Sequence, residues 1–162
     1  MNQTTKAPAV IAVVLRIPVP WVYVLGYVIG IGLERVLFPG RPLANKNWAG
    51  AAGAALFAAG AVLAAWGWLT FYKAKTTRVP GETSSAMVTW GPYRFTRNPM
   101  YLGLACAYLG EAGLLRQIAP ILFLPLVLAY VNWVVVPVEE TKLREVFAAQ
   151  YDAYRRKVRR WL

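Results

Sequence analysis

Histidine is missing from this chain of 162 residues, and cysteine occurs once, as Cys106. Without histidine, the sequence lacks the commonest general base and metal ligand of proteins. A single cysteine within an apolar run excludes an intrachain disulfide and the ligand spacing of a zinc site, so we expect Cys106 to pack inside a helix. Any chemistry must then depend on carboxylates, arginines, tyrosines and backbone groups, and we predict no metal centre.

Charged residues are also scarce, at 15% of the chain, whereas a soluble domain typically has about 25%. Hydrophobic residues make up 58%, and the mean hydropathy is +0.42. Four runs approach the roughly 20 apolar residues that a membrane helix needs, and they cover residues 17–33, 48–72, 100–115 and 118–136. We therefore predict an all-α integral membrane helical bundle, a single domain over residues 1–162 with about four transmembrane helices.

Acidic residues are the rarer charge, with 7 Asp and Glu against 18 Lys and Arg. In a soluble protein, this excess would suggest a nucleic-acid partner. Here most of the basic residues lie at the N-terminus, in the loop 73–99 and in the tail. Four transmembrane helices would place these three segments on the same side of the membrane. The exceptions are Arg35, Arg41, Lys46 and Arg116. The positive-inside rule then puts both termini and the loop in the cytoplasm, and we expect contact with membrane lipids rather than nucleic acid.

The N-terminal segment Ala7–Leu15 follows Lys6, as the apolar part of a signal peptide follows its charged start. No small-residue cleavage site follows it, so we expect it to remain uncleaved. It lies either at the membrane interface or as an extension of the first helix, and both options stay open. Further along, Gly26 and Gly30 form a G-x-x-x-G pair, which allows close helix packing and is a candidate for self-association.

The densest polar motif is G-P-Y-R-F-T-R-N-P-M-Y-L-G, from Gly91 to Gly103. Asn98-Pro99 favours an extended residue followed by a helix with proline at its first position, so a helix should begin near Pro99. Its free N–H groups and positive dipole end suit an anion such as a carboxylate. Ordinary entry of a helix into the membrane, with arginines at the interface, is the alternative.

The tail shows apolar residues at three- and four-residue steps, which predicts an amphipathic helix over residues 138–161. Glu139 and Glu140 open it where the fourth predicted span leaves the bilayer. They could simply favour the helix dipole. Ionisable groups at a membrane edge are costly unless they are used, so they could instead pair with Arg94 or Arg97, or hold a polar ligand.

The loop motif and the tail together resemble the isoprenylcysteine carboxyl methyltransferase family and, more broadly, the membrane phospholipid methyltransferase group. The matching residues are Gly91-Pro92-Tyr93-Arg94, then Arg97-Asn98-Pro99-Met100-Tyr101-Leu102-Gly103, and Glu139-Glu140 followed by Leu143, Phe147, Tyr151 and Tyr154. The resemblance implies a methyltransferase that depends on S-adenosylmethionine and encloses it near the cytosolic face. It implies cofactor binding by Tyr93, Arg97, Asn98, Pro99, Tyr101, Gly103, Glu139 and Glu140, and catalytic roles for Arg97, Glu140 and Arg94.

The chain departs from the eukaryotic members, which usually have histidine where Asn98 stands. Asparagine can hydrogen-bond but cannot titrate, so the position can bind but cannot act as an acid or base. The short chain looks like the small prokaryotic members, which suggests the bacterial inner membrane. The acceptor, which we expect to be lipophilic, could be a carboxylate, an amine or a thiol. Two other functions stay open, an NADPH-dependent enzyme resembling sterol reductases and a non-catalytic membrane protein that binds a ligand.

Overall fold

The computed structural model describes residues 18–40, 47–74 and 86–162, and every regular element in these ranges is helical. The all-α class is therefore confirmed. The elements are α2 (Val19–Leu37), α3 (Asn47–Lys73), the 3-10 helix η1 (Gly91–Arg94), α4 (Pro99–Leu114), α5 (Ala119–Tyr130), the π-helix η2 (Val131–Val135) and α6 (Val136–Lys157). The predicted segment Ala7–Leu15 lies outside the described residues.

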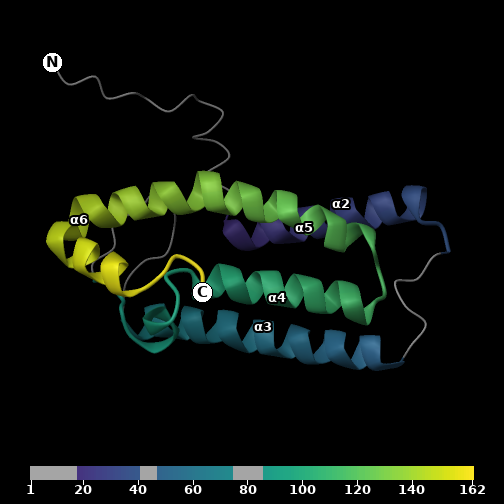
Figure 1. Ribbon diagram of the computed structural model, residues 1–162, viewed down its shortest axis with the longest axis horizontal. Helices are drawn as coiled ribbons and strands as arrows, with labels where there is room; N and C mark the ends of the chain where they lie inside the picture. Colours follow the sequence, from purple (N-terminus) through teal and green to yellow (C-terminus); the bar gives the residue numbers. More distant parts are fainter. Residues whose placement is uncertain (1–17, 41–46, 75–85) are drawn as a thin grey trace, which may run out of the picture.

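The helices form two layers, with α3 beside α4 in one and α2 beside α5 in the other (Figure 1). Small residues allow the close contacts within each layer. A Cβ on Gly103 of α4 would lie 2.6 Å from the backbone nitrogen of Ala64 in α3, and one on Gly30 of α2 would lie 2.7 Å from the Cα of Pro120 in α5. The G-x-x-x-G face of α2 therefore packs against α5 of the same chain, and it is not free for the self-association considered above.

Within residues 18–40, 47–74 and 86–162, three helices are long and apolar enough to cross a membrane, namely Val19–Leu37, Ala49–Lys73 and Ala119–Lys157. The predicted span 100–115 corresponds to α4, which has 16 residues. At 1.5 Å per residue, α4 is about 24 Å long, which is less than the roughly 30 Å of a hydrocarbon core. The protein is an integral membrane protein with three candidate spans, and α4 is a shorter helix packed against them.

The predicted tail helix 138–161 differs from the structure at both ends. It does not begin as a separate element, because α5, η2 and α6 run on without interruption, and it ends at Lys157. Val158 takes an extended conformation (φ −121°, ψ 128°), and the last residues leave the helix axis. Within α6, Ala148 has a non-helical backbone (φ 37°, ψ −111°) that kinks the helix. The physical reason for the early end is the tail's hydrogen bonding to the loop, described below.

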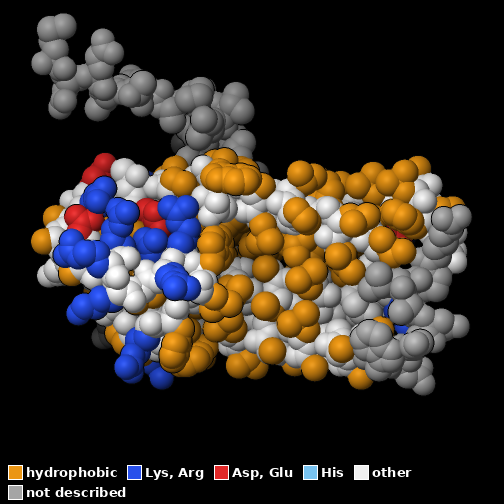
Figure 2. All heavy atoms as spheres, viewed as in Figure 1, with side chains coloured by type: hydrophobic (Ala, Val, Ile, Leu, Met, Phe, Trp, Pro, Cys, Tyr) orange, Lys and Arg blue, Asp and Glu red, His pale blue; other side chains and the backbone are white. Residues whose placement is uncertain are grey.

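The surface separates into an apolar body and a basic end. Figure 2 shows hydrophobic side chains over the length of the helices, and Lys and Arg gathered over the end formed by α6 and the tail. Large apolar side chains such as Trp133 (72% exposed) and Val62 (67% exposed) face outward. Exposure of such large apolar side chains to water would be unfavourable, but lipid chains can cover them. The distribution therefore agrees with a membrane bundle.

Candidate functional site

The polar end begins with the turn between α3 and α4. Gly91 has φ of +63°, a conformation that residues with a Cβ rarely adopt. A Cβ there would also lie 3.0 Å from the Thr70 hydroxyl. The turn leads into η1, where Tyr93 is buried and its ring meets Phe71 edge-on at 5.2 Å between centroids. Pro99 is the first residue of α4, as the sequence predicts.

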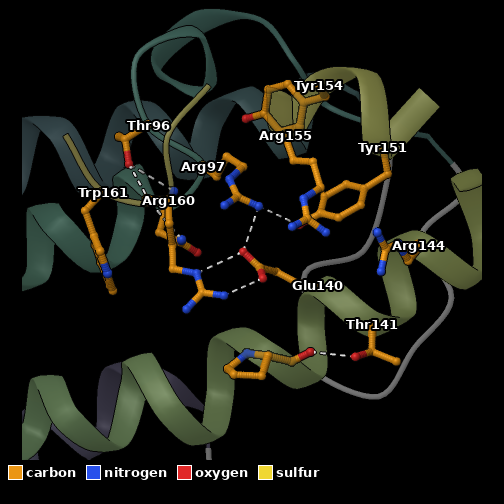
Figure 3. Close-up of polar contacts among 12 residues, drawn as sticks. Thr96, Arg97, Glu140, Thr141, Arg144, Tyr151, Tyr154, Arg155, Arg160 and Trp161 are labelled. Carbon is orange, nitrogen blue, oxygen red and sulfur yellow. Dashed lines mark hydrogen bonds and ion pairs between the residues drawn. The ribbon is translucent and has the colours of Figure 1, made fainter. Parts of the chain in front are cut away.

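Three charged side chains from distant parts of the chain meet at this end (Figure 3). The Arg97 guanidinium lies 2.8 Å from Glu140 Oε1. Arg160 donates to both oxygens of the same carboxylate, at 3.1 Å from Nε and 2.6 Å from Nη2. Arg97 also donates to the Tyr151 hydroxyl at 2.9 Å. The side chains of Arg97 and Glu140 are 13% and 20% exposed, so water screens their interaction less than at an open surface.

The cluster carries more positive than negative charge. Arg97 and Arg160 together bring two positive charges, and Glu140 brings one negative charge. The hydrogen bond from Arg160 to Glu140 raises the pKa of Arg160, so that guanidinium stays charged. Arg97 Nε is buried without a hydrogen-bond partner among the described residues. A surplus cation with an unused donor suits an anionic group such as a carboxylate or phosphate.

The C-terminal residues close over the cluster by hydrogen bonding to the loop. The Arg97 backbone N–H donates to the Arg159 carbonyl at 3.0 Å. The Arg160 carbonyl accepts from the Thr96 hydroxyl and from the Asn98 side-chain amide, both at 3.0 Å. The Trp161 indole donates to Asn132 Oδ1 at 3.0 Å. These contacts explain why α6 stops at Lys157, since the extended tail satisfies polar groups that a continuing helix would not reach.

Glu139 faces a different environment from its neighbour Glu140. Consecutive residues of a helix point about 100° apart, so Glu139 turns toward α4 while Glu140 turns toward the tail. The Tyr101 hydroxyl donates a hydrogen bond to Glu139 Oε1. No ion pair to Glu139 is found within the described ranges, whereas Glu140 contacts two guanidinium groups. The two adjacent carboxyls therefore make different contacts, one with a tyrosine hydroxyl and the other with two guanidinium groups.

Most of the residues singled out in the sequence lie at this end, but in different settings. Tyr93, Asn98, Pro99, Tyr101 and Gly103 are buried, while Arg94 is exposed. Tyr93 contributes its carbonyl, which accepts from the Tyr154 hydroxyl at 2.7 Å. Gly103 lies at the contact with α3. The suggested pairing of a glutamate with Arg97 is present, as Glu140 with Arg97.

Sequence reasoning missed Arg160, Asn132 and Trp161. Arg160 is one of the basic residues of the tail, which the sequence analysis uses only for the orientation in the membrane, and nothing in its spacing from Glu140 suggests contact. Asn132 lies in the π-helical segment η2, and π-bulges often occur at functional sites. An asparagine inside an otherwise apolar run is the one signal that could have drawn attention to this position.

Comparison with protein families places the chain beside a known group of membrane enzymes. The model described as phospholipid methyltransferase matches residues 48–150, which include the loop motif, both glutamates and most of α6. No curated protein and no solved structure gives a significant match.

Proposed function

Because the chain belongs to the phospholipid methyltransferase family, a family of membrane methyltransferases that use S-adenosylmethionine, we propose that its acceptor is a phospholipid headgroup at the end that holds the Arg97–Glu140–Arg160 cluster. The family match decides for a methyltransferase over the reductase and non-catalytic alternatives. When bound, S-adenosylmethionine supplies an electrophilic methyl group on a sulfonium. The remaining steps concern what this chain's own residues do.

The charged and aromatic groups of this end suit the cofactor. Arg97, with its unpartnered Nε, would hold the carboxylate of the cofactor's amino-acid part, since guanidinium groups bind carboxylates by paired hydrogen bonds. Glu140 keeps Arg97 in place. Tyr93, Asn98, Pro99, Tyr101, Gly103 and Glu139 complete the proposed cofactor site: Tyr101 and Glu139 bring polar atoms, and Gly103 lets α4 approach α3 closely.

The contrast between the two glutamates carries the choice of acceptor. An amine acceptor is protonated near neutral pH and must lose a proton before its nitrogen can form a bond to carbon. Both carboxylate oxygens of Glu140 are already occupied by the guanidinium groups of Arg97 and Arg160. Glu139 has no cationic partner within the described ranges, and Tyr101 orients it. We therefore assign proton acceptance to Glu139, and an amine headgroup to the acceptor.

Arg94 is suited to the phosphate of the same lipid. Its side chain is exposed beside the polar end, and no ion pair or hydrogen bond is found for it among the described residues. A guanidinium at the membrane surface can bind a headgroup phosphate. This role would make Arg94 a substrate contact rather than a cofactor contact.

The orientation proposed for the enzyme follows from its charge distribution. Among the described residues, the basic side chains of α6 and the tail gather at the polar end (Figure 2). Arg94 and Arg97 belong to the same end, while Arg35 and Arg116 line the cleft at the other end. Although α4 is short, α2, α3, α4 and α5 run alternately between the two ends, so α2 starts at the polar end (Figure 1). The positive-inside rule then favours a cytoplasmic position for the polar end and, with it, for both termini. A bacterial inner membrane and a small prokaryotic relative of the isoprenylcysteine carboxyl methyltransferases remain our proposals for its setting.

The test is methyl transfer from labelled S-adenosylmethionine in lipid nanodiscs. We expect transfer to phosphatidylethanolamine and none to phosphatidylglycerol, which has no amine. Phosphoethanolamine, the soluble headgroup, should react far more slowly, because the apolar body admits the acceptor from the bilayer. Arg94→Gln should raise the KM for the lipid with little change in cofactor affinity, whereas Arg156→Gln, another exposed arginine, should change neither. Equal activity on the soluble and lipid-linked acceptors would refute the proposed lipid substrate.

A further inference from the structure

A cleft of about 460 Å³ opens at the end of the bundle opposite the polar site. It lies where the C-terminal turn of α2 approaches the connection between α4 and α5 (Figure 1). Its walls include Glu34, Arg35, Phe38, Leu115, Arg116 and Gln117. The cleft is shallow and open rather than enclosed, and the site described above uses none of these residues.

The acidic residue of this cleft, Glu34, already has hydrogen-bond partners within the protein. Glu34 Oε2 accepts hydrogen bonds from the backbone N–H groups of Ile118, at 2.9 Å, and Ala119, at 2.5 Å. These groups open α5 and would otherwise lack partners. Glu34 thus serves as a cap supplied by α2. Its carboxylate is engaged there rather than in an ion pair with Arg35 or Arg116, and none is found for it among the described residues.

The remaining polar groups of the cleft are donors. Arg35 and Arg116 take part in no ion pair found within the described ranges, although both line the cleft. Gln117 accepts a hydrogen bond from the Tyr27 hydroxyl through Oε1, at 2.8 Å, which leaves its amide N–H groups as donors. Two guanidinium groups and an amide around one opening suit an anion with several acceptor oxygens.

The backbone that presents Arg116 is itself unusual. Arg116 has φ of +58°, a left-handed conformation that non-glycine residues adopt uncommonly. Hydrogen bonds on both sides hold this turn, from Arg116 N to Gly113 O at 3.2 Å and from Gln117 N to Ala112 O at 2.8 Å. Glycine or asparagine would fit this conformation with less strain, so an arginine here suggests that the side chain is used.

Apolar side chains continue outward from the cleft along the membrane-facing surface. Val36, Leu37, Leu114 and Leu115 are exposed at 76%, 58%, 44% and 53%. Lipid chains can cover these side chains while a headgroup reaches the arginines. We infer that this cleft binds the phosphate of a phospholipid from the leaflet opposite the polar end, with the acyl chains lying along α2 and α4. The site is separate from the proposed methyl acceptor and does not depend on it.

Native mass spectrometry of the full-length, delipidated protein tests this inference. The probes are a short-chain phosphatidylglycerol, a diacylglycerol with the same chains but no phosphate, and glycerol phosphate with no chains. Arg35→Gln and Arg116→Gln should each weaken phosphatidylglycerol binding by about tenfold, as expected for the loss of one charge-assisted contact. The matched control is Arg156→Gln, an exposed arginine at the other end, which should leave this binding unchanged.

Each outcome bears on the inference. Binding of phosphatidylglycerol that far exceeds that of both other probes, and that weakens in both cleft variants, supports the phospholipid site. Equal binding of glycerol phosphate would show a site for soluble phosphate esters and overturn the lipid assignment. Unchanged phosphatidylglycerol binding in a variant that combines Arg35→Gln with Arg116→Gln would overturn the site itself. Retained S-adenosylmethionine binding at the opposite end shows that each variant is folded, so a loss of lipid binding cannot be attributed to unfolding.

Discussion

Replacing Arg160 with glutamine should weaken cofactor binding by releasing Glu140, although Arg160 lies near the end of the chain. Its guanidinium makes two hydrogen bonds to the Glu140 carboxylate, at 3.1 and 2.6 Å. The substitution keeps the backbone carbonyl that accepts from Thr96 and Asn98, so the tail stays attached to the loop. The variant therefore removes the two hydrogen bonds to Glu140 and a longer one, of 3.4 Å, to Asn132 Oδ1, which Trp161 continues to contact.

The expected size follows from the geometry. Hydrogen bonds to charged groups contribute about 1.5–3 kcal/mol, and exposed ion pairs contribute about 0–1 kcal/mol. The Arg160 side chain is 33% exposed and that of Glu140 is 20% exposed, so we take an intermediate value of about 1–2 kcal/mol. This corresponds to S-adenosylmethionine binding that is weaker by roughly 5- to 30-fold.

The assay is calorimetric titration of S-adenosylmethionine into the detergent-purified protein. Four forms complete a double-mutant cycle, namely the wild type, Arg160→Gln, Glu140→Gln and the double variant. We expect the double variant to bind about as weakly as Glu140→Gln alone, because both changes break one interaction. Arg160→Lys should restore part of the affinity, since lysine keeps the charge but loses the paired geometry. Strictly additive losses would refute the argument that Arg160 acts through Glu140.

Three other changes test the site and the fold. Glu139→Gln should lower kcat for an amine lipid by roughly 100-fold or more, the usual contribution of a general base; an unchanged kcat in the nanodisc assay would remove Glu139 as proton acceptor. Ala148→Gly should raise thermal stability by about 1 kcal/mol, because glycine relieves the strain at φ 37°, whereas Ala149→Gly should lower it by a similar amount; equal effects in thermal unfolding would contradict the strain. Gly103→Ala should destabilise by about 1–3 kcal/mol through overpacking against α3, while Gly32→Ala, with nothing within 4 Å, should not; equal melting temperatures would count against tight α3–α4 packing.

Local patterns in the sequence were sufficient to predict where the helix near the site begins. Proline at the first position of a helix and the restriction it places on the preceding residue put the start of α4 at Pro99. The length of the apolar runs predicts the helical membrane class, because a lipid environment requires every backbone group to be satisfied within a helix. For residues 100–115, the apolar run predicted a transmembrane helix. The structure has the shorter helix α4 there, which packs closely against α3.

The sequence also predicted that Arg97 and a glutamate could meet, because the loop and the tail both carried charges at a membrane edge. It could not say which glutamate pairs with Arg97 and which with Tyr101. That difference depends on the angle between consecutive residues of α6 once its rotation is fixed by packing. The rotation of the segment before the kink at Ala148 is set by buried residues such as Val135 and Val136, and hydrophobic pattern alone does not fix it closely enough to separate neighbours.

What the sequence determined by itself is chemical and local: a membrane protein without histidine, a helix beginning at Pro99, and a polar loop and tail with the residue types of a methyltransferase. The tertiary structure decided which of those groups touch. It brought Arg160 back to Glu140 across a helix that ends at Lys157, placed Asn132 against Trp161, and set Arg35 and Arg116 around one cleft. The physical reason is that turns and helix periodicity act over a few residues, whereas these contacts join residues far apart in the chain and form only when the helices pack.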